Sequence, residues 1–362
     1  MTDRDDTDRG DADRSGGAGP PTSRTGRLRV MQSFSRIRPN TNPYLVQLVS
    51  ATSAGVEMVT FSWVSALRGN FDVLHIHWPE VMLRGPGRVS TWSRRAAFAV
   101  LLLRTRLGHR GLVRTMHNLR PHEEGPRIER WLIEVCERWT TVWIRLNEGE
   151  RPPSSAPVVT IPHGDYRQWY AAYPVPPSRA GVLLYFGLVR AYKGVDRLIG
   201  VFKDCPDPAL RLRVVGKAEP GPLRDLIVAA QLADERIAAE LRFLSDEEVA
   251  GEVGRAQLVV LPYRDMFNSG TLLLALSIGR PVLVPSNRVT EALADEVGPQ
   301  WIIRYAGELS CEAIRDAVDR TKSTTAGDQP DLSRRGWDLI GAQHVTAYYR
   351  AADVARNRVN FM

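Results

Sequence analysis

Short apolar runs alternate with stretches of helical periodicity along most of the chain, and this alternation restricts the fold more than any other feature. In the first half the apolar runs are RLRVMQSF, GVEMVTFSW, FDVLHIHW, GLVRTMHN, TTVWIRL and PVVTIPHG, and a helix-like stretch follows each of them. Strands that alternate with helices are joined by crossovers and pair in parallel. The pattern therefore predicts a parallel sheet with helices on both faces.

A proline-rich segment at residues 173–181 separates this half from a second series of the same kind. Its strand candidates are GVLLYFG, LRLRVVG, LRFLS, AQLVVLPY and PVLVPS, with helical patterns between them such as residues 222–242. A chain of 362 residues is long enough for two domains with separate cores. We therefore expect an α/β protein with two Rossmann-like domains that face a cleft, followed by an amphipathic C-terminal helix at residues 335–353.

The same sequence patterns predict where the domains and the two tails begin and end. Residues 1–25 mix charges with Gly, Ser and Pro and bury too little apolar surface to offset the entropy of ordering, so we expect a disordered tail. The N-terminal Rossmann-like domain is expected at residues 26–175 and the C-terminal one at 176–334. A C-terminal helix and tail are expected at 335–362.

Composition excludes several classes of protein. Hydrophobic residues make up 43% of the chain and charged residues 25%, as in ordinary globular domains. The N-terminus has no apolar segment behind a basic start, so we expect a cytoplasmic protein without a secretory signal. Cys136, Cys205 and Cys311 lack metal-ligand spacing, and we interpret them as structural residues in a reducing compartment, with no support for a disulfide framework.

Positive charge is concentrated in the first half. The formal net charge is +7, and the segment from Val81 to Thr115 contains eight arginines and no acidic residue. Such a charge admits nucleic acid, anionic lipid or phosphorylated substrates as partners. Residues 92–107 join an apolar run to arginines that include Arg94 and Arg95, and are too short and interrupted to span a bilayer. They form either an interfacial helix that meets anionic lipid, or a core helix with arginines at its ends.

Residues that suit phosphate binding follow strands in the second half, where ligands of an open parallel sheet gather. Residues 185–199 resemble a strand, a turn and a helix, with Arg190 and Lys193 placed where two cations could hold a diphosphate. Residues 268–271, Asn-Ser-Gly-Thr, open another helix and offer N–H groups and hydroxyls to phosphate oxygens. The alternatives are a solvated surface loop for the cations and an ordinary N-cap for the helix.

These segments resemble the consensus of glycosyltransferase family four, in which a glycine after a strand is followed six positions later by Lys-Gly. Gly187, Lys193 and Gly194 match it, and residues 261–286 resemble the family's later Gly-x-Pro-Val segment. The chain also departs from the consensus, because Leu188 holds the place of the family's arginine, and Arg190 is interpreted as its substitute.

The family's two glutamates are missing as well. Met266 and Leu274 hold their places, and in relatives the second glutamate is associated with the ribose of the nucleotide. We expect either another residue, with Asp265 as partial compensation, or backbone groups to hold the ribose.

Three strand ends of the first half each carry histidine, in the segments HIHWPE, TMHNLRPHE and IPHGDY. The position of His117 resembles the family's Thr-x-His-Asp pattern, with Asn118 in place of the aspartate. The histidines lack the spacing of zinc motifs, and they suit sugar hydroxyls and a diphosphate better than a metal. Together the three segments resemble bacterial exopolysaccharide enzymes that include GDP-mannose:glycolipid β-mannosyltransferases.

The resemblance implies a GT-B glycosyltransferase that moves a hexose, with mannose favoured, from GDP-mannose or a UDP-sugar to a glycolipid or polyprenyl-linked polysaccharide precursor. No metal or other cofactor is expected, because cations at the diphosphate would assist its departure. The first domain would hold the acceptor, which would be met at the inner face of the membrane, and the second domain the nucleotide sugar. An inverting reaction needs a base for the acceptor's proton, whereas a retaining one does not.

The predicted site residues fall into three groups. The catalytic candidates are His117, Glu80 and Glu123. The donor-binding candidates are Gly187, Arg190, Lys193, Lys217, Asp265, Ser269, Gly270 and Thr271. The candidates for contacts with the acceptor or a sugar are Asn118, His163, Arg94 and Arg95. For Glu80 an equally simple interpretation is that Trp-Pro-Glu opens a loop or caps a helix.

Two other classes of function remain open on the sequence. The basic first half could bind nucleic acid, although the sequence carries no helix-turn-helix, zinc-finger or aromatic RNA-binding signature. The chain could also be a GT-B-like nucleotide-sugar epimerase or a phosphorylase. Product analysis separates these, because an epimerase needs no acceptor and a phosphorylase needs phosphate.

Overall fold

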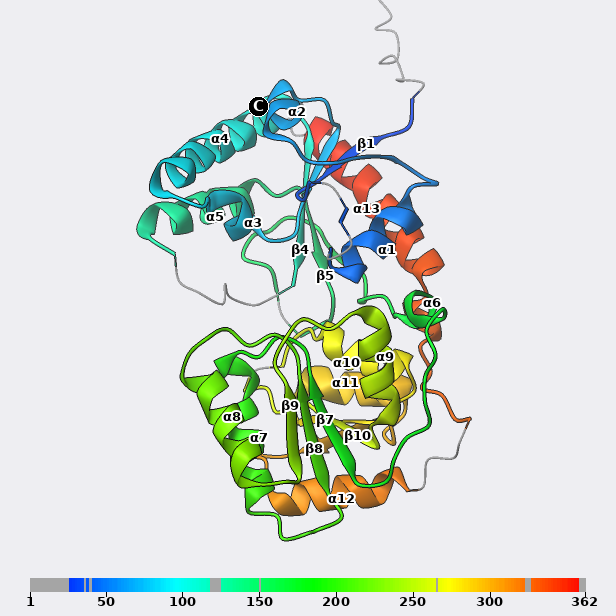
Figure 1. Ribbon diagram of the computed structural model, residues 1–362. Helices are drawn as coiled ribbons and strands as arrows, with labels where there is room; N and C mark the ends of the chain where they lie inside the picture. The colour runs from blue at the N-terminus through cyan, green and yellow to red at the C-terminus, as the bar shows by residue number, and fades with distance from the viewer. Residues whose placement is uncertain are drawn as a thin grey trace, which may run out of the picture.

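The computed structural model describes residues 26–357, except for residues 36, 39–40, 118–124, 150, 265 and 323–326. Figure 1 shows two α/β domains, each built on a parallel sheet of six strands. The strand order is β2-β1-β3-β4-β5-β6 in the first sheet and β12-β11-β10-β7-β8-β9 in the second. The second order is that of a Rossmann fold.

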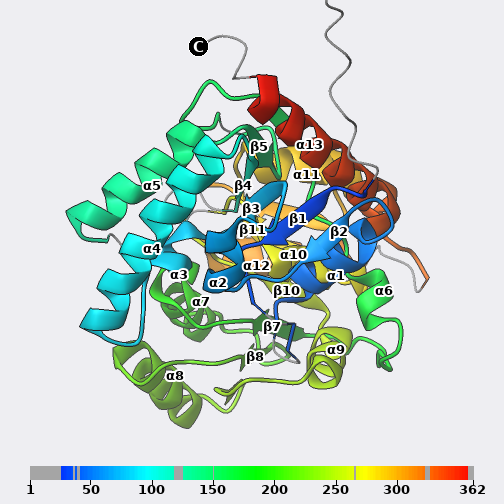
Figure 2. The same ribbon diagram turned by 90° about the horizontal axis from the view of Figure 1, so that it is seen from above.

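The first sheet is covered by helices on both faces. Its strands are β1 (Arg29–Gln32), β2 (Glu57–Val59), β3 (Val73–Ile76), β4 (Gly111–Met116), β5 (Val142–Arg145) and β6 (Val158–Thr160). Successive side chains of a strand point to opposite faces. Val113 accordingly packs towards α1 (Pro43–Thr52) and α13 (Trp337–Asn357). Leu112 packs towards the other face, with α2 (Trp63–Arg68), α3 (Pro79–Leu83), α4 (Arg88–Leu107) and α5 (Arg127–Trp139). Seen from above, α4 and α5 lie side by side, away from α1 and α13 (Figure 2).

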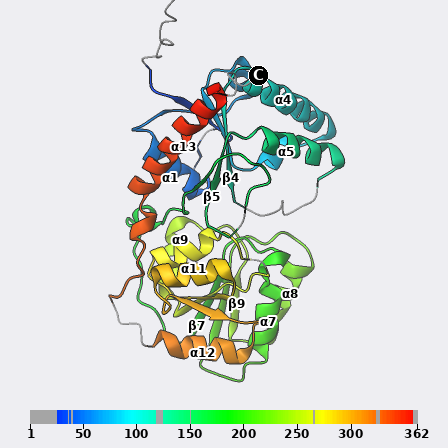
Figure 3. The same ribbon diagram turned by 180° about the vertical axis from the view of Figure 1, so that it is seen from behind.

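The second sheet has a single continuous apolar core. Its strands are β7 (Val182–Phe186), β8 (Arg211–Val215), β9 (Ile237–Glu240), β10 (Leu258–Val260), β11 (Val282–Pro285) and β12 (Ile302–Tyr305). Its helices are α7 (Val195–Lys203), α8 (Pro222–Ala233), α9 (Asp246–Arg255), α10 (Gly270–Ser277), α11 (Arg288–Val297) and α12 (Cys311–Thr321). In Figures 1 and 3, α7 and α8 lie on one side of this sheet, and α9 and α11 on the other.

The chain crosses between the two domains twice. The first crossing carries α6 (Arg167–Tyr170), and the second carries the 3-10 turn η2 (Ser333–Arg335) and leads into α13. The two crossings touch, because the Trp337 indole N–H donates to the Asp165 carbonyl at 2.7 Å and the Arg335 guanidinium donates to the His163 carbonyl at 3.1 Å. Figure 3 shows α13 running along α1 on the first domain. The predicted C-terminal helix therefore completes the first domain, although it follows the second in sequence.

The prediction for residues 222–242 was partly wrong. The helix there ends at Ala233, and Ile237–Glu240 form strand β9, which the alanine-rich sequence had suggested to be helical. The predicted strand LRFLS is instead a connection that leads to the N-cap Ser245 of α9. Strand β12 was not predicted, so the second sheet has one strand more than expected.

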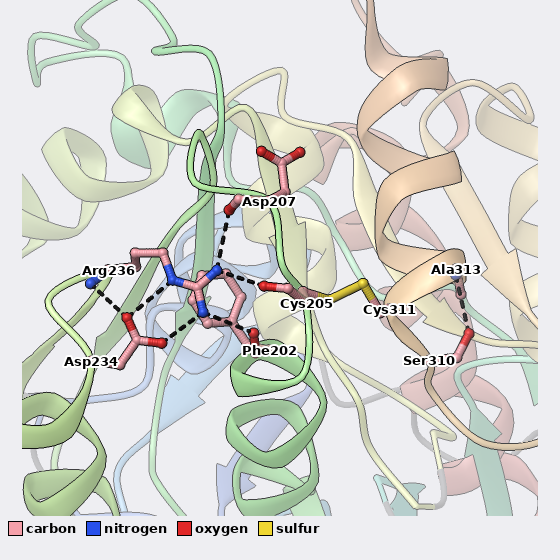
Figure 4. The surroundings of a disulfide bond; sticks show 8 residues. All are labelled: Phe202, Cys205, Asp207, Asp234, Arg236, Ser310, Cys311 and Ala313. Atoms are coloured by element: carbon pink, nitrogen blue, oxygen red, sulfur yellow. Dashed lines mark hydrogen bonds and ion pairs between the residues drawn. A yellow bond between two sulfur atoms is a disulfide. The ribbon is translucent and has the colours of Figure 1, made fainter.

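Two of the three cysteines form a disulfide, contrary to the expectation from the sequence. Cys205 follows α7 and is bonded to Cys311 at the start of α12, with 5.3 Å between the Cα atoms (Figure 4). Arg236 donates to the Cys205 carbonyl at 2.6 Å and forms an ion pair with Asp234. The missing CxxC spacing was no guide, since residues 106 positions apart meet only through the fold. Cys136 is a buried free thiol.

Candidate active site

Each sheet has one topological switch point. The strand order reverses between β1 and β3 in the first sheet, and between β7 and β10 in the second. Connections leave in opposite directions at such a point, and this opens a crevice beyond the carboxyl ends of the two strands. Most of the predicted site residues follow strands next to these two points.

Gly187 lies directly after β7, next to two other predicted residues of the second switch point. Its backbone φ is 109°, a conformation that glycine adopts readily and other residues rarely do. A Cβ atom at this position would lie 3.3 Å from the Thr271 hydroxyl and 3.6 Å from the Lys193 ammonium. The predicted residues Gly187, Lys193 and Thr271 are therefore neighbours. We refer to them, together with Ser269 and Gly270, as the cationic site.

Lys193 supplies the charge of the cationic site. Its side chain is buried, with 8% of the residue exposed, and its Nζ lies 5.1 Å from the centre of the Tyr263 ring. No carboxylate among the residues that the structure describes forms an ion pair with it. A buried ammonium is costly unless an anion compensates it. The site is consequently suited to an anionic ligand.

The start of α10 forms the other side of the cationic site. The Ser269 hydroxyl accepts from the Leu272 N–H at 3.2 Å, so Ser269 acts as the N-cap that was the simpler interpretation of this segment. The remaining N–H groups of the first turn have no partner within the helix and carry a partial positive charge. The Tyr166 hydroxyl and His163 Nε2 lie 3.0 and 3.8 Å from where a Cβ of Gly270 would be, so side chains of the first crossing reach this helix start.

Two predicted donor-binding cations lie further out. Arg190 and Lys217 are both exposed, and Lys217 is paired with Glu219 at 2.9 Å. Asp265 lies outside the described residues. Met266 and Leu274, which replace the family's glutamates, pack against the apolar core of the second domain.

The first switch point is lined by histidines. His77 follows β3 and is hydrogen-bonded through Nδ1 to His117 Nε2, which follows β4, at 3.0 Å. Its Nε2 is 3.0 Å from Gln32 Oε1 at the end of β1. The His117 ring stacks on Trp78, with 4.3 Å between the ring centres, and meets Tyr44 edge-on.

Burial keeps these rings neutral. It lowers the pKa of His77 and His117 well below the usual value, and neighbouring histidines and Arg114 add to the effect. Burial also lowers the pKa of His163 to about 4. The histidines therefore carry no charge at neutral pH and are able to accept a proton or a hydrogen bond. Among the residues of the described ranges, no group of three or more His, Cys, Asp or Glu side chains is arranged to hold a metal ion.

A contact between the domains, which was not predicted, joins the two switch points. The Asn268 amide, just before α10, donates to the backbone carbonyls of Met116 and His117 at 3.3 and 3.2 Å. Its oxygen accepts from Asn147, beyond β5, at 2.9 Å. The helix start of the cationic site is thereby fixed against the strand end that carries His117. Nothing in the local sequence marks Asn147, because its partner is 121 residues away.

Comparison with known proteins identifies the family. Two proteins of Xanthomonas campestris pv. campestris, both named GDP-mannose:glycolipid 4-β-D-mannosyltransferase, are 43% and 42% identical to the chain over 327 residues. The matches cover 90% of this chain and 93% of each relative. The chain belongs to this glycosyltransferase family. No family model matches the sequence.

Solved structures show that this glycosyltransferase has the GT-B fold. HepE of Anabaena in complex with UDP and glucose matches with a TM-score of 0.55 at 13% identity, over 92% of this chain and 99% of that one. Sucrose-phosphate synthase of Thermosynechococcus elongatus matches with a TM-score of 0.57 at 15% identity, over 92% and 98% of the two chains. The expected fold of two Rossmann-like domains is confirmed.

The remaining predicted residues of the glycosyltransferase have different surroundings. Glu80 lies in the first turn of α3, two residues after Trp78, and is partly exposed. Trp-Pro-Glu thus opens a helix, but no side chain caps it. Asn118 and Glu123 lie outside the described residues.

Arg94 and Arg95 are tied into the first domain. Arg95 pairs at 3.3 Å with Glu129, whose side chain is 2% exposed, and Arg84 pairs with the same carboxylate at 2.8 Å. Arg94 donates to the Arg84 carbonyl. These arginines therefore hold α4, α5 and the connection after α3 together. None of the helices in the described ranges has the length and apolar character needed to cross a bilayer.

The outer surface of α4 is apolar instead. Exposed hydrophobic side chains recur along it at helical spacing, and Arg88 and Arg104 are exposed beside them. The apolar residues are Val89, Trp92, Val100, Leu103 and Leu107. The inner side of α4 packs in the core through Phe98, Leu101 and Leu102, as the core-helix interpretation of residues 92–107 expected, whereas contact of the outer side with lipid stays a prediction.

Proposed function

We propose that this glycosyltransferase transfers mannose from GDP-mannose to a glycolipid and inverts the configuration at the anomeric carbon. The two relatives are named for these substrates and for a β-linked product. The mannose of GDP-mannose is α-linked, so a β-linked product requires inversion. The observation that carries the proposal is the buried Lys193 beside Gly187 and Thr271, braced through Asn268 against His117.

On the donor side, the diphosphate would bind at the cationic site. The Lys193 ammonium and the first turn of α10 would stabilise the negative charge that develops as the bond between the anomeric carbon and the phosphate oxygen breaks. Gly187 would allow the phosphates to approach the backbone after β7. Arg190 and Lys217 would flank the diphosphate from the exposed side, and Asp265 would contact the ribose.

On the acceptor side, His117 would be the base. The acceptor oxygen attacks the anomeric carbon, its proton passes to the imidazole, and the diphosphate leaves with the electron pair of the broken bond. His117 suits this role because it is neutral, partly exposed and held between Trp78 and Tyr44. His163 and Asn118 would bind sugar hydroxyls. Glu80 and Glu123 are the second candidates for the base.

The lipid part of the acceptor would meet the outer surface of α4. Exposed Trp92 and Leu103 can enter the interface of a bilayer, and Arg88 and Arg104 can attract anionic headgroups. Arg94 and Arg95 would support this surface from behind through their contacts with Arg84 and Glu129. The enzyme would then act as a peripheral protein on the cytoplasmic face of the membrane.

A thermal-shift panel of GDP-, UDP-, ADP- and dTDP-sugars tests the donor assignment, because a ligand that binds only the folded state raises the melting temperature. We expect GDP-mannose and GDP to give the largest shift. The shift should be lost in Lys193→Ala and kept in Lys217→Ala, the matched exposed lysine. A larger shift with a UDP-sugar would reject GDP-mannose as the donor, and an equal shift in Lys193→Ala would reject the cationic site.

A further inference from the structure

A continuous chain of hydrogen bonds runs from the core of the first domain to His117. Gln32 at the end of β1 bonds with its oxygen to His77 Nε2 and with its nitrogen to the Tyr348 hydroxyl of α13, at 3.0 and 3.2 Å. Tyr348 is also 2.9 Å from His75 Nδ1, and His75 Nε2 is 2.8 Å from the Thr115 hydroxyl. All of these side chains except His117 are buried.

The direction of each bond follows from what each atom is able to donate. The Gln32 nitrogen donates to Tyr348 Oη, and its oxygen accepts only if His77 Nε2 carries a hydrogen. A neutral imidazole has a single N–H, so His77 Nδ1 bears no hydrogen and accepts from His117 Nε2. The one hydrogen of a neutral His117 is then on Nε2, and its Nδ1 keeps a lone pair to which no donor among the described residues is bonded.

We infer that Gln32 and His77 are positioning residues that hold His117 in the tautomer whose Nδ1 is unprotonated. The inference rests on the proposed function of His117 as the base, because it names the atom that receives the acceptor's proton. The role resembles that of a buried carboxylate that orients a catalytic histidine, except that a neutral amide and a second imidazole perform it.

The second half of the chain is compatible with this orientation of the Gln32 amide. Tyr348 accepts from the Gln32 nitrogen and donates its own hydrogen to His75 Nδ1, and the N–H of His75 is then directed at Thr115. A rotated amide would require every one of these bonds to reverse. The polarity of the whole network is therefore coupled to the tautomer of His117.

The surroundings keep the network neutral. Among the described residues, the groups that lower the pKa of His77 or His117 by their charge include Arg114 on β4, His75 on β3, His163 beyond β6 and His344 on α13. Each of them disfavours a positive charge on these rings, in addition to burial. The buried Tyr44 of α1 also contacts both rings, but it is neutral. When His117 accepts a proton at Nδ1, its Nε2 hydrogen can shift to His77 Nδ1, so the charge can be shared between two rings.

Two substitutions of Gln32 test the inference. Gln32→Glu offers two acceptor oxygens, so it keeps the hydrogen on His77 Nε2, while the Tyr348 hydroxyl turns from His75 to donate to the new carboxylate. We expect it to retain turnover within about threefold and to shift the acid limb of the pH profile upwards, since a carboxylate raises the pKa of the adjacent histidines. Gln32→Met removes the oxygen that accepts from His77 Nε2, so His117 can adopt either neutral tautomer. We therefore expect kcat to fall on the order of tenfold with an unchanged KM for GDP-mannose.

The tautomer itself is measured by long-range ¹H–¹⁵N spectra of the histidine rings at neutral pH. The signals of His117 are assigned by their loss in His117→Ala. We expect His117 to carry its hydrogen on Nε2 in the native enzyme and in Gln32→Glu, and to populate both tautomers in Gln32→Met. A hydrogen on Nδ1 in the native enzyme, or a loss of turnover in Gln32→Glu as large as in Gln32→Met, would overturn the inference.

These spectra need no substrate, so they remain decisive if the donor assignment fails or if Gln32→Met does not fold. A native Nε2–H tautomer together with full activity of His117→Ala would instead reject His117 as the base, and would leave the positioning by Gln32 and His77 standing.

Discussion

The two switch points occupy the same place in two similar sheets, yet they differ in charge. Six of the seven histidines of the chain lie within residues 75–163, and residues 164–343 contain none. The seventh, His344, belongs to α13, which packs on the first sheet. The first switch point is thus lined by buried neutral rings, whereas the second holds the buried ammonium of Lys193. A neutral site that can accept hydrogen bonds and a positively charged site are thus kept apart on different domains.

The largest effect is expected from removing the proton acceptor. His117→Ala should lower kcat by about 10²- to 10⁴-fold, the usual contribution of a general base. The melting temperature should change little, because His117 is partly exposed. Steady-state kinetics with GDP-mannose, together with a thermal melt, measure both quantities. A variant that fails to fold would mean that His117 serves the core of the first domain.

Removing the charge from the second switch point should have the next largest effect. Lys193→Ala should lower kcat on the order of 100-fold, the loss expected for one preorganised contact to a developing charge. Lys217→Ala is the matched control, because Lys217 is exposed and paired with Glu219, and it should remain within a few-fold of the native rate. Equal rates for the two variants would mean that burial of the cation is irrelevant to turnover.

Mild acid should destabilise the first domain selectively. The pKa of His163 and of His344 is lowered to about 4 in the folded protein, so the unfolded state binds more protons between about pH 6.5 and 4. The free energy of unfolding should therefore fall as the pH drops through this window, by about 1.5 kcal/mol per buried histidine between pH 6.5 and 5.

Hydrogen exchange measured along the chain distinguishes the domains. Amides of β3 and β4 should lose protection at pH 5, after correction for the intrinsic exchange rate, while those of β8 and β10 should keep it. His344→Gln should make the pH dependence shallower, because it removes one of the buried groups. Parallel losses in both sheets would contradict the contrast between the switch points.

The smallest effect concerns the membrane. Trp92→Ala combined with Leu103→Ala should weaken binding to anionic vesicles on the order of tenfold, because both side chains are exposed on α4 and would enter the interface. Leu226→Ala with Leu232→Ala, on exposed positions of α8, should leave binding unchanged. Co-sedimentation measures both pairs. The affinity for GDP-mannose should be the same in all of these variants, since neither helix surface belongs to the cationic site.

The sequence predicted the second switch point better than the first. Gly187 and Lys193 belong to one strand, turn and helix, so their spacing alone brings them together. His117 was found through its place after a strand. Gln32 and Tyr348 were not predicted, because they are 316 residues apart and meet only where α13 packs on the first sheet.

Other differences have equally physical causes. Arg95 was expected at a surface that meets the acceptor, but no local pattern marks its partner Glu129 on the neighbouring helix. Strand β9 was mistaken for helix because Ile237–Glu240 contain two alanines, which favour helices in isolation. Pairing with β8 outweighs that preference.

The position of α13 has a consequence for biosynthesis. Domains usually fold in the order in which they leave the ribosome. Here the core around β1, β3 and β4 lacks part of one covering layer until residues 337–357 of α13 have been made, so the second domain, which is contiguous, is ready to fold earlier. The hydrogen-bond network at Gln32 likewise stays incomplete until Tyr348 arrives. A ribosome that stalls shortly before α13 would release a chain that contains every residue of the cationic site but lacks the Tyr348 contact of Gln32.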